Sequence, residues 1–395
     1  MTTQSTRRLV TSDVARATPT ETAAAAEAAA GMQAFAHRLL SEHPELFGGP
    51  NAVVSSASIG TAFAMLRAGA MGETAAQIDD VLGFPSSGLG SACNFLTERW
   101  TTPRQDGPEL SVANELFFQE GLVFKAAFLD ALARDFGVGV QTVDFTGDAA
   151  ELINAWVREQ TRDRIQGLFD ELSPSTRLVL ANAIYLKATW VSQFTAEATW
   201  DAEFRRSTGD PVHVPFMHQT SDFDFVREDG WSAVRLPYRG GELSMWVLLP
   251  DDIADPVALL DPAVLARATA SATRQAVELS LPKWDFQSDV TLTDVLPAMG
   301  MPRAFSPAAE FGGIADPPLM IDDVVHRADI TVDEEGTEAA AVTSIIMRVA
   351  MVISSADAVF DADHPFAFAV LHDATGSPLF EGVVGNPTGE STSRG

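Results

Sequence analysis

The spacing of apolar residues divides the chain into an early part rich in helices and a later part rich in strands. The segments with helical spacing are Met32–Leu40, Ile59–Ala70, Thr74–Leu82, Lys125–Phe136, Ala149–Thr161 and Val290–Met299. The segments that indicate strands are Ser111–Gln119, Val138–Phe145, Leu178–Leu186, Ala276–Leu281 and Val324–Asp333, with two more in the C-terminal region. A hairpin is predicted at Trp231–Pro237 and Leu243–Leu249. Because helices come first and strands later, we predict an α+β fold with antiparallel or mixed sheets.

The two ends of the chain are polar. We expect residues 1–30 to form a mobile start, although the alanine run Ala23–Ala30 favours the beginning of the first helix. Residues 388–395 read as a polar tail. The intervening residues 31–387 contain no repeat and no long linker, so we predict one large domain.

Charge and cysteine content exclude several classes of protein. The 395 residues include 26 Lys and Arg against 54 Asp and Glu, a formal charge of −28, which disfavours nucleic acid as a partner. The one cysteine, Cys93, cannot form an intrachain disulfide, and we expect it to be a buried apolar residue. No apolar run has the length of a signal peptide or a membrane span, so we expect no membrane partner and a cytoplasmic location, with export by another route left open.

The usual signatures of enzymes and metal sites are missing. The sequence has no G-x-S-x-G elbow and no H-E-x-x-H pair. Adjacent acids at Asp79-Asp80, Asp251-Asp252 and Asp322-Asp323 fit a solvated surface in so acidic a chain. We therefore predict no cofactor, no metal and no enzymatic activity.

The segment Gly336–Ala350 has the pattern of a strand that can be buried on one face. Alternate residues of a strand point to opposite faces. One set is small or apolar throughout: Thr337, Ala339, Ala341, Thr343, Ile345 and Met347. The other set holds both charged residues: Glu338, Ala340, Val342, Ser344, Ile346 and Arg348. No proline interrupts the segment. A short helix capped by Thr337 is the alternative, but it leaves Gly336 and the β-branched residues unexplained.

Six segments resemble blocks of the serpins, the serine-protease-inhibitor superfamily, and they follow one another in family order. They are Val54–Leu66, Asn114–Leu122, Leu180–Trp190, Val325–Ala341, His364–Phe368 and Ser377–Pro387. The resemblance implies the serpin fold, with helices packed around three β-sheets and a mobile reactive-centre loop at about residues 334–355. We also expect a monomer.

The resemblance assigns roles to particular residues. The hinge of the loop would be Glu334, Glu335, Gly336, Thr337, Glu338, Ala339, Ala340 and Ala341. The usual spacing from the hinge glycine places the scissile bond at Ala350–Met351. Alanine before that bond suits elastase-like or subtilisin-like serine proteases, and a shift to Met351 suits chymotrypsin-like ones. Arg348 would suit trypsin-like proteases only in a shorter loop.

Two polar groups resemble the parts of the family that control opening of the central sheet. Ser55, Ser58, Asn182 and His326 match the shutter, and Trp190 and Lys283 match the breach. Lys283 is expected to pair with Glu334. Ser56 stands where the family usually has proline, which would alter the turn before the next helix.

The function implied is suicide inhibition, in which a protease cuts the loop and is carried away by its insertion into the central sheet. The alternative is a non-inhibitory serpin that acts as a carrier, chaperone or storage protein. Members of that kind tend to have bulky, charged or proline residues in the hinge. Thr337 and Ala339–Ala341 are small, which favours inhibition.

Overall fold

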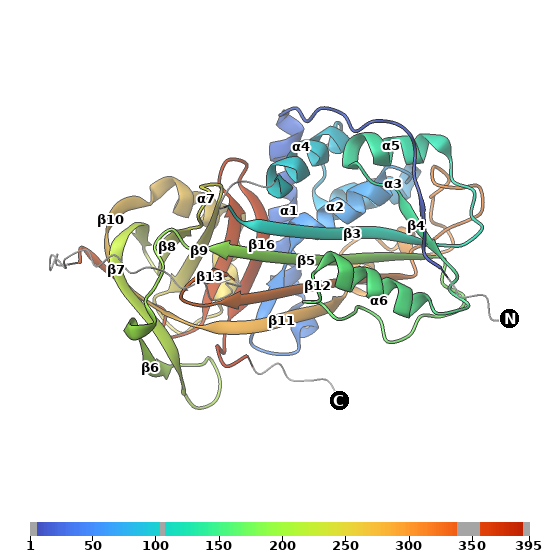
Figure 1. Cartoon of the computed structure of the whole chain (residues 1–395). Helices are drawn as coiled ribbons and strands as arrows, with labels where there is room; N and C mark the ends of the chain where they lie inside the picture. The colour runs from blue at the N-terminus through green and yellow to red at the C-terminus, as the bar shows by residue number, and fades with distance from the viewer. Residues whose placement is uncertain (1–5, 103–106, 338–355, 390–395) are drawn as a thin grey trace.

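The fold is two large sheets with helices gathered mainly on one side. The computed structural model describes residues 6–102, 107–337 and 356–389. Its α-helices are α1 (Ala23–Glu42), α2 (Ser56–Arg67), α3 (Gly72–Leu82), α4 (Leu89–Thr101), α5 (Ala126–Phe136), α6 (Ala149–Gln160), α7 (Pro262–Ser271) and α8 (Val295–Ala298). Short 3₁₀ turns are η1 (Pro44–Phe47), η2 (Ala196–Ala198), η3 (Pro256–Leu260) and η4 (Arg303–Phe305). Figure 1 shows α1–α5 together above the long strands, with α6 across their other face.

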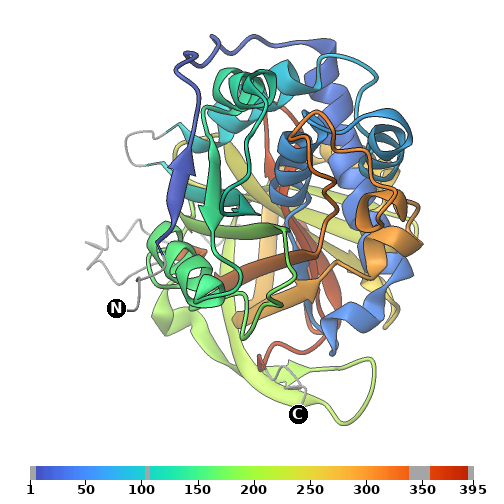
Figure 2. The ribbon, with the colours of Figure 1, turned by 90° about the vertical axis from the view of Figure 1, so that its right-hand side faces the viewer.

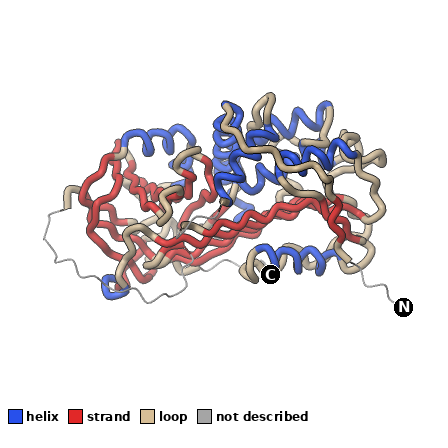
Figure 3. The backbone as a smooth tube through the Cα atoms, turned by 45° about the horizontal axis from the view of Figure 1, so that its top comes forward, coloured by secondary structure: helices blue, strands red, loops and turns tan. Residues whose placement is uncertain are grey.

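Among the described residues, the first sheet has seven strands, and it extends from the middle of the molecule to the right-hand end in Figure 3. In spatial order they are β1 (Arg8–Val10), β4 (Val140–Val143), β3 (Glu109–Gln119), β5 (Leu178–Thr189), β13 (Gly336–Thr337), β12 (Asp323–Val332) and β11 (Trp284–Thr291). All residues of β5 from Leu178 to Leu186 are buried, as their unbroken apolar character predicts for a strand covered on both faces. The main core covers one face, and a smaller apolar cluster under α6 covers the other, where Trp156 packs edge-on against Phe117 with ring centroids 5.5 Å apart.

In the part of the chain that the structure describes, the second sheet has nine strands. Along its main path they are β14 (Ala358–Asp361), β10 (Thr273–Pro282), β7 (Val212–Glu228), β8 (Trp231–Pro237), β9 (Leu243–Pro250), β15 (Phe366–His372), β16 (Ser377–Val384) and β2 (Ala52–Val54), and β6 (Thr199–Phe204) pairs with β7. The predicted hairpin is present as β8 and β9. The long β7 pairs with β6 and β10 in its first part and with β8 at its end. β7 therefore joins into one hydrogen-bonded sheet the strands that, by the family resemblance, would form two separate sheets.

Three parts of the chain differ from the sequence prediction. The predicted helix Val290–Met299 is wrong at its start, because Val290 and Thr291 end β11 and the helix α8 is only four residues long. Strict alternation of buried and exposed positions from Trp284 onward is the strand pattern that the prediction missed. Within the polar first thirty residues, β1 pairs antiparallel with β4 (Figure 2), and α1 begins at Ala23 as the alanine run indicates. Helices α4 and α7 and strands β6 and β7 were not predicted.

The described residues agree with the expectation that Cys93 is a buried apolar residue. Cys93 is 1% exposed, and burial raises the pKa of its thiol to about 12, so it behaves as a small apolar core residue. Among the helices of the described ranges, none has both the length and the apolar character needed to cross a bilayer.

Candidate functional site

The hinge of the expected loop lies inside the seven-stranded sheet. Strands β5 and β12 pair directly and in parallel over six residues, from Val179 opposite Asp323 to Ile184 opposite Ala328. Beyond that point the two strands separate and β13 lies between them, antiparallel to both. Thr337 is opposite Ala188 on one side and Val332 on the other. The seam between β5 and β12 is therefore closed along one part and already occupied by hinge residues at the other.

Thr337 is held by Tyr238, which is itself stacked on Trp190. Thr337 is 1% exposed, and its Oγ1 lies 2.6 Å from the hydroxyl of Tyr238. Tyr238 stacks on Trp190 with ring centroids 4.4 Å apart. Burial raises the pKa of Tyr238, so its hydroxyl stays protonated and able to bond Thr337. Trp190, predicted as part of the breach, thus lies next to the base of the hinge, where its indole N–H donates to the carbonyl of Asp333 at 3.1 Å.

Gly336 occupies a position where no side chain fits. A Cβ atom added to it would lie 1.9 Å from the carbonyl oxygen of Ala188 on the neighbouring strand. Atoms that close overlap, so any other residue would have to push β13 and β5 apart. The close approach of the two strands therefore explains why residue 336 is a glycine, apart from the backbone freedom of that residue type.

The base of the hinge is fixed by side-chain and backbone bonds. The Nζ of Lys283 lies 2.7 Å from Oε2 of Glu334, so the predicted pair is present, and the Thr199 hydroxyl donates to Oε1 at 2.8 Å. Burial acts to raise the pKa of Glu334, but these bonds and its own backbone N–H outweigh burial and hold the pKa below its usual value. The backbone N–H of Trp190 donates to the backbone carbonyl of Glu335 at 2.9 Å.

The four predicted shutter residues meet in one buried network. The N–H of Ser55 donates to Nε2 of His326 at 3.0 Å, and Nδ1 of His326 bonds Oδ1 of Asn182. The Nδ2 of Asn182 donates to the Ser58 hydroxyl at 2.7 Å, and that hydroxyl donates to Oδ1 of Asn114 at 2.9 Å. Asn114, Asn182 and His326 are opposite one another on β3, β5 and β12, so the network crosses the closed part of the seam.

His326 must be neutral in this network. Its Nε2 accepts a hydrogen bond from Ser55, so the single proton of the neutral ring lies on Nδ1 and is donated to Asn182. Complete burial without a carboxylate partner lowers the pKa of His326 to about 3. The shutter is thus held by hydrogen bonds between uncharged groups, which cost less to separate in a core than paired charges.

Ser56 has a specific partner at the start of α2. Its hydroxyl lies 3.2 Å from Oε2 of Glu381, a buried residue of β16. Burial raises the pKa of Glu381 well above its usual value. The family's usual proline has no hydroxyl, so this bond follows from the serine noted in the sequence.

Sequence reasoning missed Asn114, Tyr238 and Glu381. Glu381 left a signal, because it is a charged residue within a largely apolar strand segment, whereas Asn114 is one of several polar residues of its strand. Tyr238 left none, since its contact with Thr337 joins residues 99 positions apart. The predicted site residues Glu338, Ala339, Ala340, Ala341, Ala350 and Met351 lie outside the described residues.

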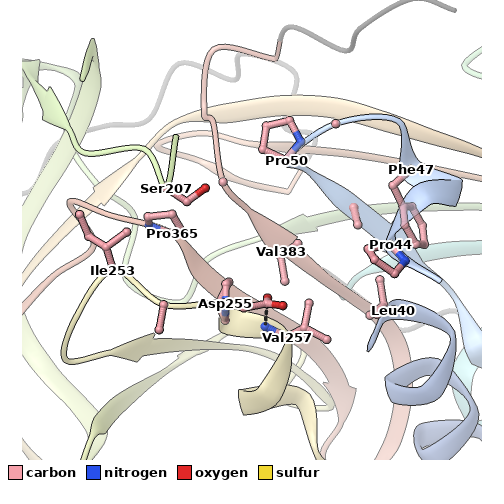
Figure 4. Close-up of a pocket in the computed structure, with 15 residues that line it drawn as sticks. Leu40, Pro44, Phe47, Pro50, Ser207, Ile253, Asp255, Val257, Pro365 and Val383 are labelled. Carbon is pink, nitrogen blue, oxygen red and sulfur yellow. Dashed lines mark hydrogen bonds between the residues drawn. The ribbon is translucent and has the colours of Figure 1, made fainter. Parts of the chain in front are cut away.

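A separate hollow, lined by no hinge residue, lies between α1, η3 and the end of β16 (Figure 4). It measures about 320 Å³ and is lined mainly by apolar residues, including Leu40, Phe47 and Val383. Of the described residues that line it, Asp255 alone is ionisable, and its carboxylate accepts the Val257 N–H at 3.0 Å. No cluster of His, Cys, Asp and Glu among the described residues could hold a metal ion.

Comparisons with known proteins agree with this geometry. The family model described as "Serpin (serine protease inhibitor)" matches residues 30–387. An uncharacterized serpin-like protein of Thermococcus kodakarensis is 37% identical over 356 residues, covering 87% of this chain and 83% of that protein. The leukocyte elastase inhibitor of Bos taurus is 34% identical, covering 85% of this chain and 93% of that protein.

Solved structures show the same fold. Thyroxine-binding globulin in complex with thyroxine has a TM-score of 0.80 at 27% identity, covering 91% of this chain and 99% of that one. The thermophilic serpin tengpin in its native state has a TM-score of 0.85 at 23% identity, covering 97% of this chain and all of that one. The chain belongs to the serpin family. Many members of the family inhibit proteases, and others, such as ovalbumin and thyroxine-binding globulin, do not.

Proposed function

We propose that this protein inhibits serine proteases as a suicide substrate. The observation that supports the proposal most directly is the placement of Gly336 and Thr337 between β5 and β12. A hinge that has already entered the sheet has begun the movement that trapping requires. Its pairing also sets the register in which the rest of the loop would follow.

The two ladders around β13 agree on one register for insertion. Continuing the antiparallel pairing of Thr337 with Ala188 brings Thr343 opposite Asn182 on β5. Continuing its pairing with Val332 brings the same Thr343 opposite His326 on β12. Asn182 and His326 are themselves opposite in the closed seam, so the loop can enter without any slip of β5 against β12.

This register also agrees with the two sets of side chains. Thr337 points into the core, so Ala339, Ala341, Thr343 and the later residues of its set would follow it inward. These are the small and apolar members of the segment. The charged members of the other set, Glu338 and Arg348, would lie on the opposite face.

The proposed reaction begins as ordinary proteolysis. The protease serine oxygen attacks the carbonyl carbon of Ala350, the bond to the Met351 nitrogen breaks, and the new amine leaves with the part of the chain that continues into β14. The acyl ester keeps the protease attached to Ala350. Insertion of the freed strand at ~3.3 Å per residue carries the protease about 50 Å and distorts its oxyanion hole, so hydrolysis of the ester stalls.

The shutter supplies the barrier that keeps the loop out until it is cut. Inserting Thr343 separates His326 from Asn182, which are bonded across the seam. The hydroxyl of a threonine can both donate and accept, so it can take over both broken partners in the inserted state. Breaking the bonds before the new ones form is a kinetic cost, which fits a native state held by a barrier.

Incubation with elastase, subtilisin and chymotrypsin tests the proposal. We expect a covalent complex that survives SDS with at least one of them, and a cleaved form that melts at a higher temperature than the intact one. Cleavage that gives neither the complex nor the gain in melting temperature would reject inhibition and favour a carrier, chaperone or storage role.

A further inference from the structure

The outer face of the second sheet, at the end where β14, β10, β7 and β6 lie side by side, is acidic and partly apolar. These strands lie at the left-hand end of the molecule in Figure 1. Opposite residues of paired strands share a face. The registers put Val359, Glu278 and Thr220 in one row across the sheet, and Asp361, Ser280 and His218 in the next. We call these two rows and their neighbours on the same side the acidic face.

Two large apolar side chains are exposed on the acidic face. Trp200 of β6 is 54% exposed and Val359 of β14 is 58% exposed. Trp200 is opposite Phe216 and stacks on His218, with ring centroids 3.6 Å apart and the planes at 8°. The stack holds the indole in one orientation while leaving much of its surface open to solvent. Rigid exposed aromatics of this kind are typical of surfaces that bind another protein.

The charge of the acidic face is mainly negative. Its carboxylates are Asp222, Glu278, Asp357 and Asp361. Among the described residues, Arg274 lies on the same side in the row beyond Asp222, where it is opposite Asp224. Burial lowers the pKa of His218, so its ring adds no positive charge near neutral pH. The surface therefore complements a partner with exposed lysine or arginine.

The chain itself brings a protease to this end of the molecule. Only about seven residues separate Met351 from the start of β14 at Ala358, so the expected scissile bond lies within ~25 Å of Ala358. A globular protease of about 220 residues has a radius of gyration of ~17 Å and cannot bind that bond without covering neighbouring surface. The stretch from Thr337 to the expected scissile bond is longer, so it restricts the position of that bond less.

We propose that the acidic face is a docking surface for a cationic serine protease, which contacts it outside the protease active site while the reactive bond is bound. This inference rests on the proposed function, because it assumes that a protease attacks the loop. Attraction between the acidic face and basic protease side chains speeds the encounter, and Trp200 packs against the apolar part of the partner. The acidic face then selects among proteases that would accept the same loop sequence.

Glu278→Lys tests the charge part of this proposal. The matched control is Asp80→Lys, which makes the same change in net charge at an exposed position on α3. With chymotrypsin, a cationic protease, we expect Glu278→Lys to lower the second-order rate constant of inhibition about tenfold at low salt, and the difference to shrink as salt is added. Asp80→Lys should stay within about twofold of the unchanged protein.

Chymotrypsin with succinylated lysines separates docking from loop chemistry. Its active site and loop preference are retained while its surface charge is reversed, so Glu278→Lys should no longer slow inhibition. Equal slowing with native and succinylated chymotrypsin would overturn the proposal and place the effect of Glu278 in the loop itself. Failure of the proposed function would look different, because the unchanged protein would then form no covalent complex at all.

Trp200→Ala tests the apolar part of the acidic face, again by the rate constant of inhibition of chymotrypsin and by formation of the covalent complex. We expect inhibition to be about tenfold slower with the number of protease molecules trapped per inhibitor unchanged. Unchanged melting temperature would show that the fold survives the substitution. An unchanged rate constant in this variant and in Glu278→Lys would reject the docking surface.

Discussion

Replacing Thr337 by arginine should turn the protein from an inhibitor into a substrate. Thr337 is 1% exposed and its hydroxyl is bonded to that of the fully buried Tyr238 at 2.6 Å. An arginine would bring a guanidinium into this core without a carboxylate to receive it. It would also leave the Tyr238 hydroxyl unpaired, at a cost of about 1–3 kcal/mol.

The size of this energetic penalty indicates that the substitution acts on the rate of loop insertion. A penalty of about 3 kcal/mol at the first step of insertion slows that step roughly 150-fold. The acyl-enzyme divides between insertion and hydrolysis, so slower insertion releases the protease. Full insertion replaces six residue pairs of the β5–β12 seam with two ladders along the new strand. The net gain is about 14 backbone hydrogen bonds, on the order of 10 kcal/mol, so the cut variant should still insert in time.

The assay is the stoichiometry of inhibition with elastase, read together with SDS-stable complex and with melting of the cleaved protein. Thr337→Arg should lose nearly all of the complex and raise the stoichiometry at least severalfold, while its cleaved form still melts higher than the intact one. Thr337→Ser, which keeps a small side chain and the hydroxyl, is the control and should trap protease normally. Trapping by Thr337→Arg at unchanged stoichiometry would refute the insertion register.

Two further predictions concern the shutter and the breach. Because the pKa of His326 falls from its ordinary value near 6.5 in the unfolded chain to about 3 in the fold, the unfolded state takes up the proton first, and stability is lost as pH falls from about 6.5 towards 3. The amide of His326→Gln can make the same two bonds but does not titrate. The unfolding free energy of this variant should therefore change less with pH in that window than that of the unchanged protein, by up to ~1.4 kcal/mol per pH unit. Equal slopes in the two proteins would contradict the neutral buried ring. Lys283→Ala should lower the unfolding free energy of the intact protein by no more than about 1 kcal/mol, since Lys283 is 36% exposed, and by less in high salt. A loss of several kcal/mol in denaturant titrations would show that the pair with Glu334 does more than a surface ion pair.

Most long elements could be predicted because their own residues carry the pattern. Strand β5 is buried on both faces, and its sequence is correspondingly apolar throughout. Helix α4 was missed because its buried face includes Asn94, which looks like a solvent residue in the sequence. In the fold Asn94 accepts a hydrogen bond from Arg16 at 2.7 Å. Strand β7 was missed because Pro215 and several acids interrupt it. In both α4 and β7, the element is stabilised by partners from distant segments of the chain.

The site was predicted in part of its composition but not in its geometry. The family resemblance supplied His326, Asn182 and Lys283, since these residues keep fixed places in the motifs. It did not supply the register that aligns Asn114 with Asn182, because strand pairing depends on the whole sheet. Nor did it show that Thr337 is already buried, because a strand of two residues leaves no periodic pattern.

The short link between β12 and β13 has a consequence for how the chain folds. β13 follows β12 after only Asp333–Glu335, whereas the β5–β12 seam joins residues 144 positions apart. Local hairpins form faster than distant pairings, so a chain refolding from denaturant is drawn towards extending the hairpin down the sheet. During synthesis β5 and β12 leave the ribosome before the residues that would displace them. We therefore expect that the order of translation favours the active form, and that refolding of the complete chain yields a share of inactive, fully inserted molecules.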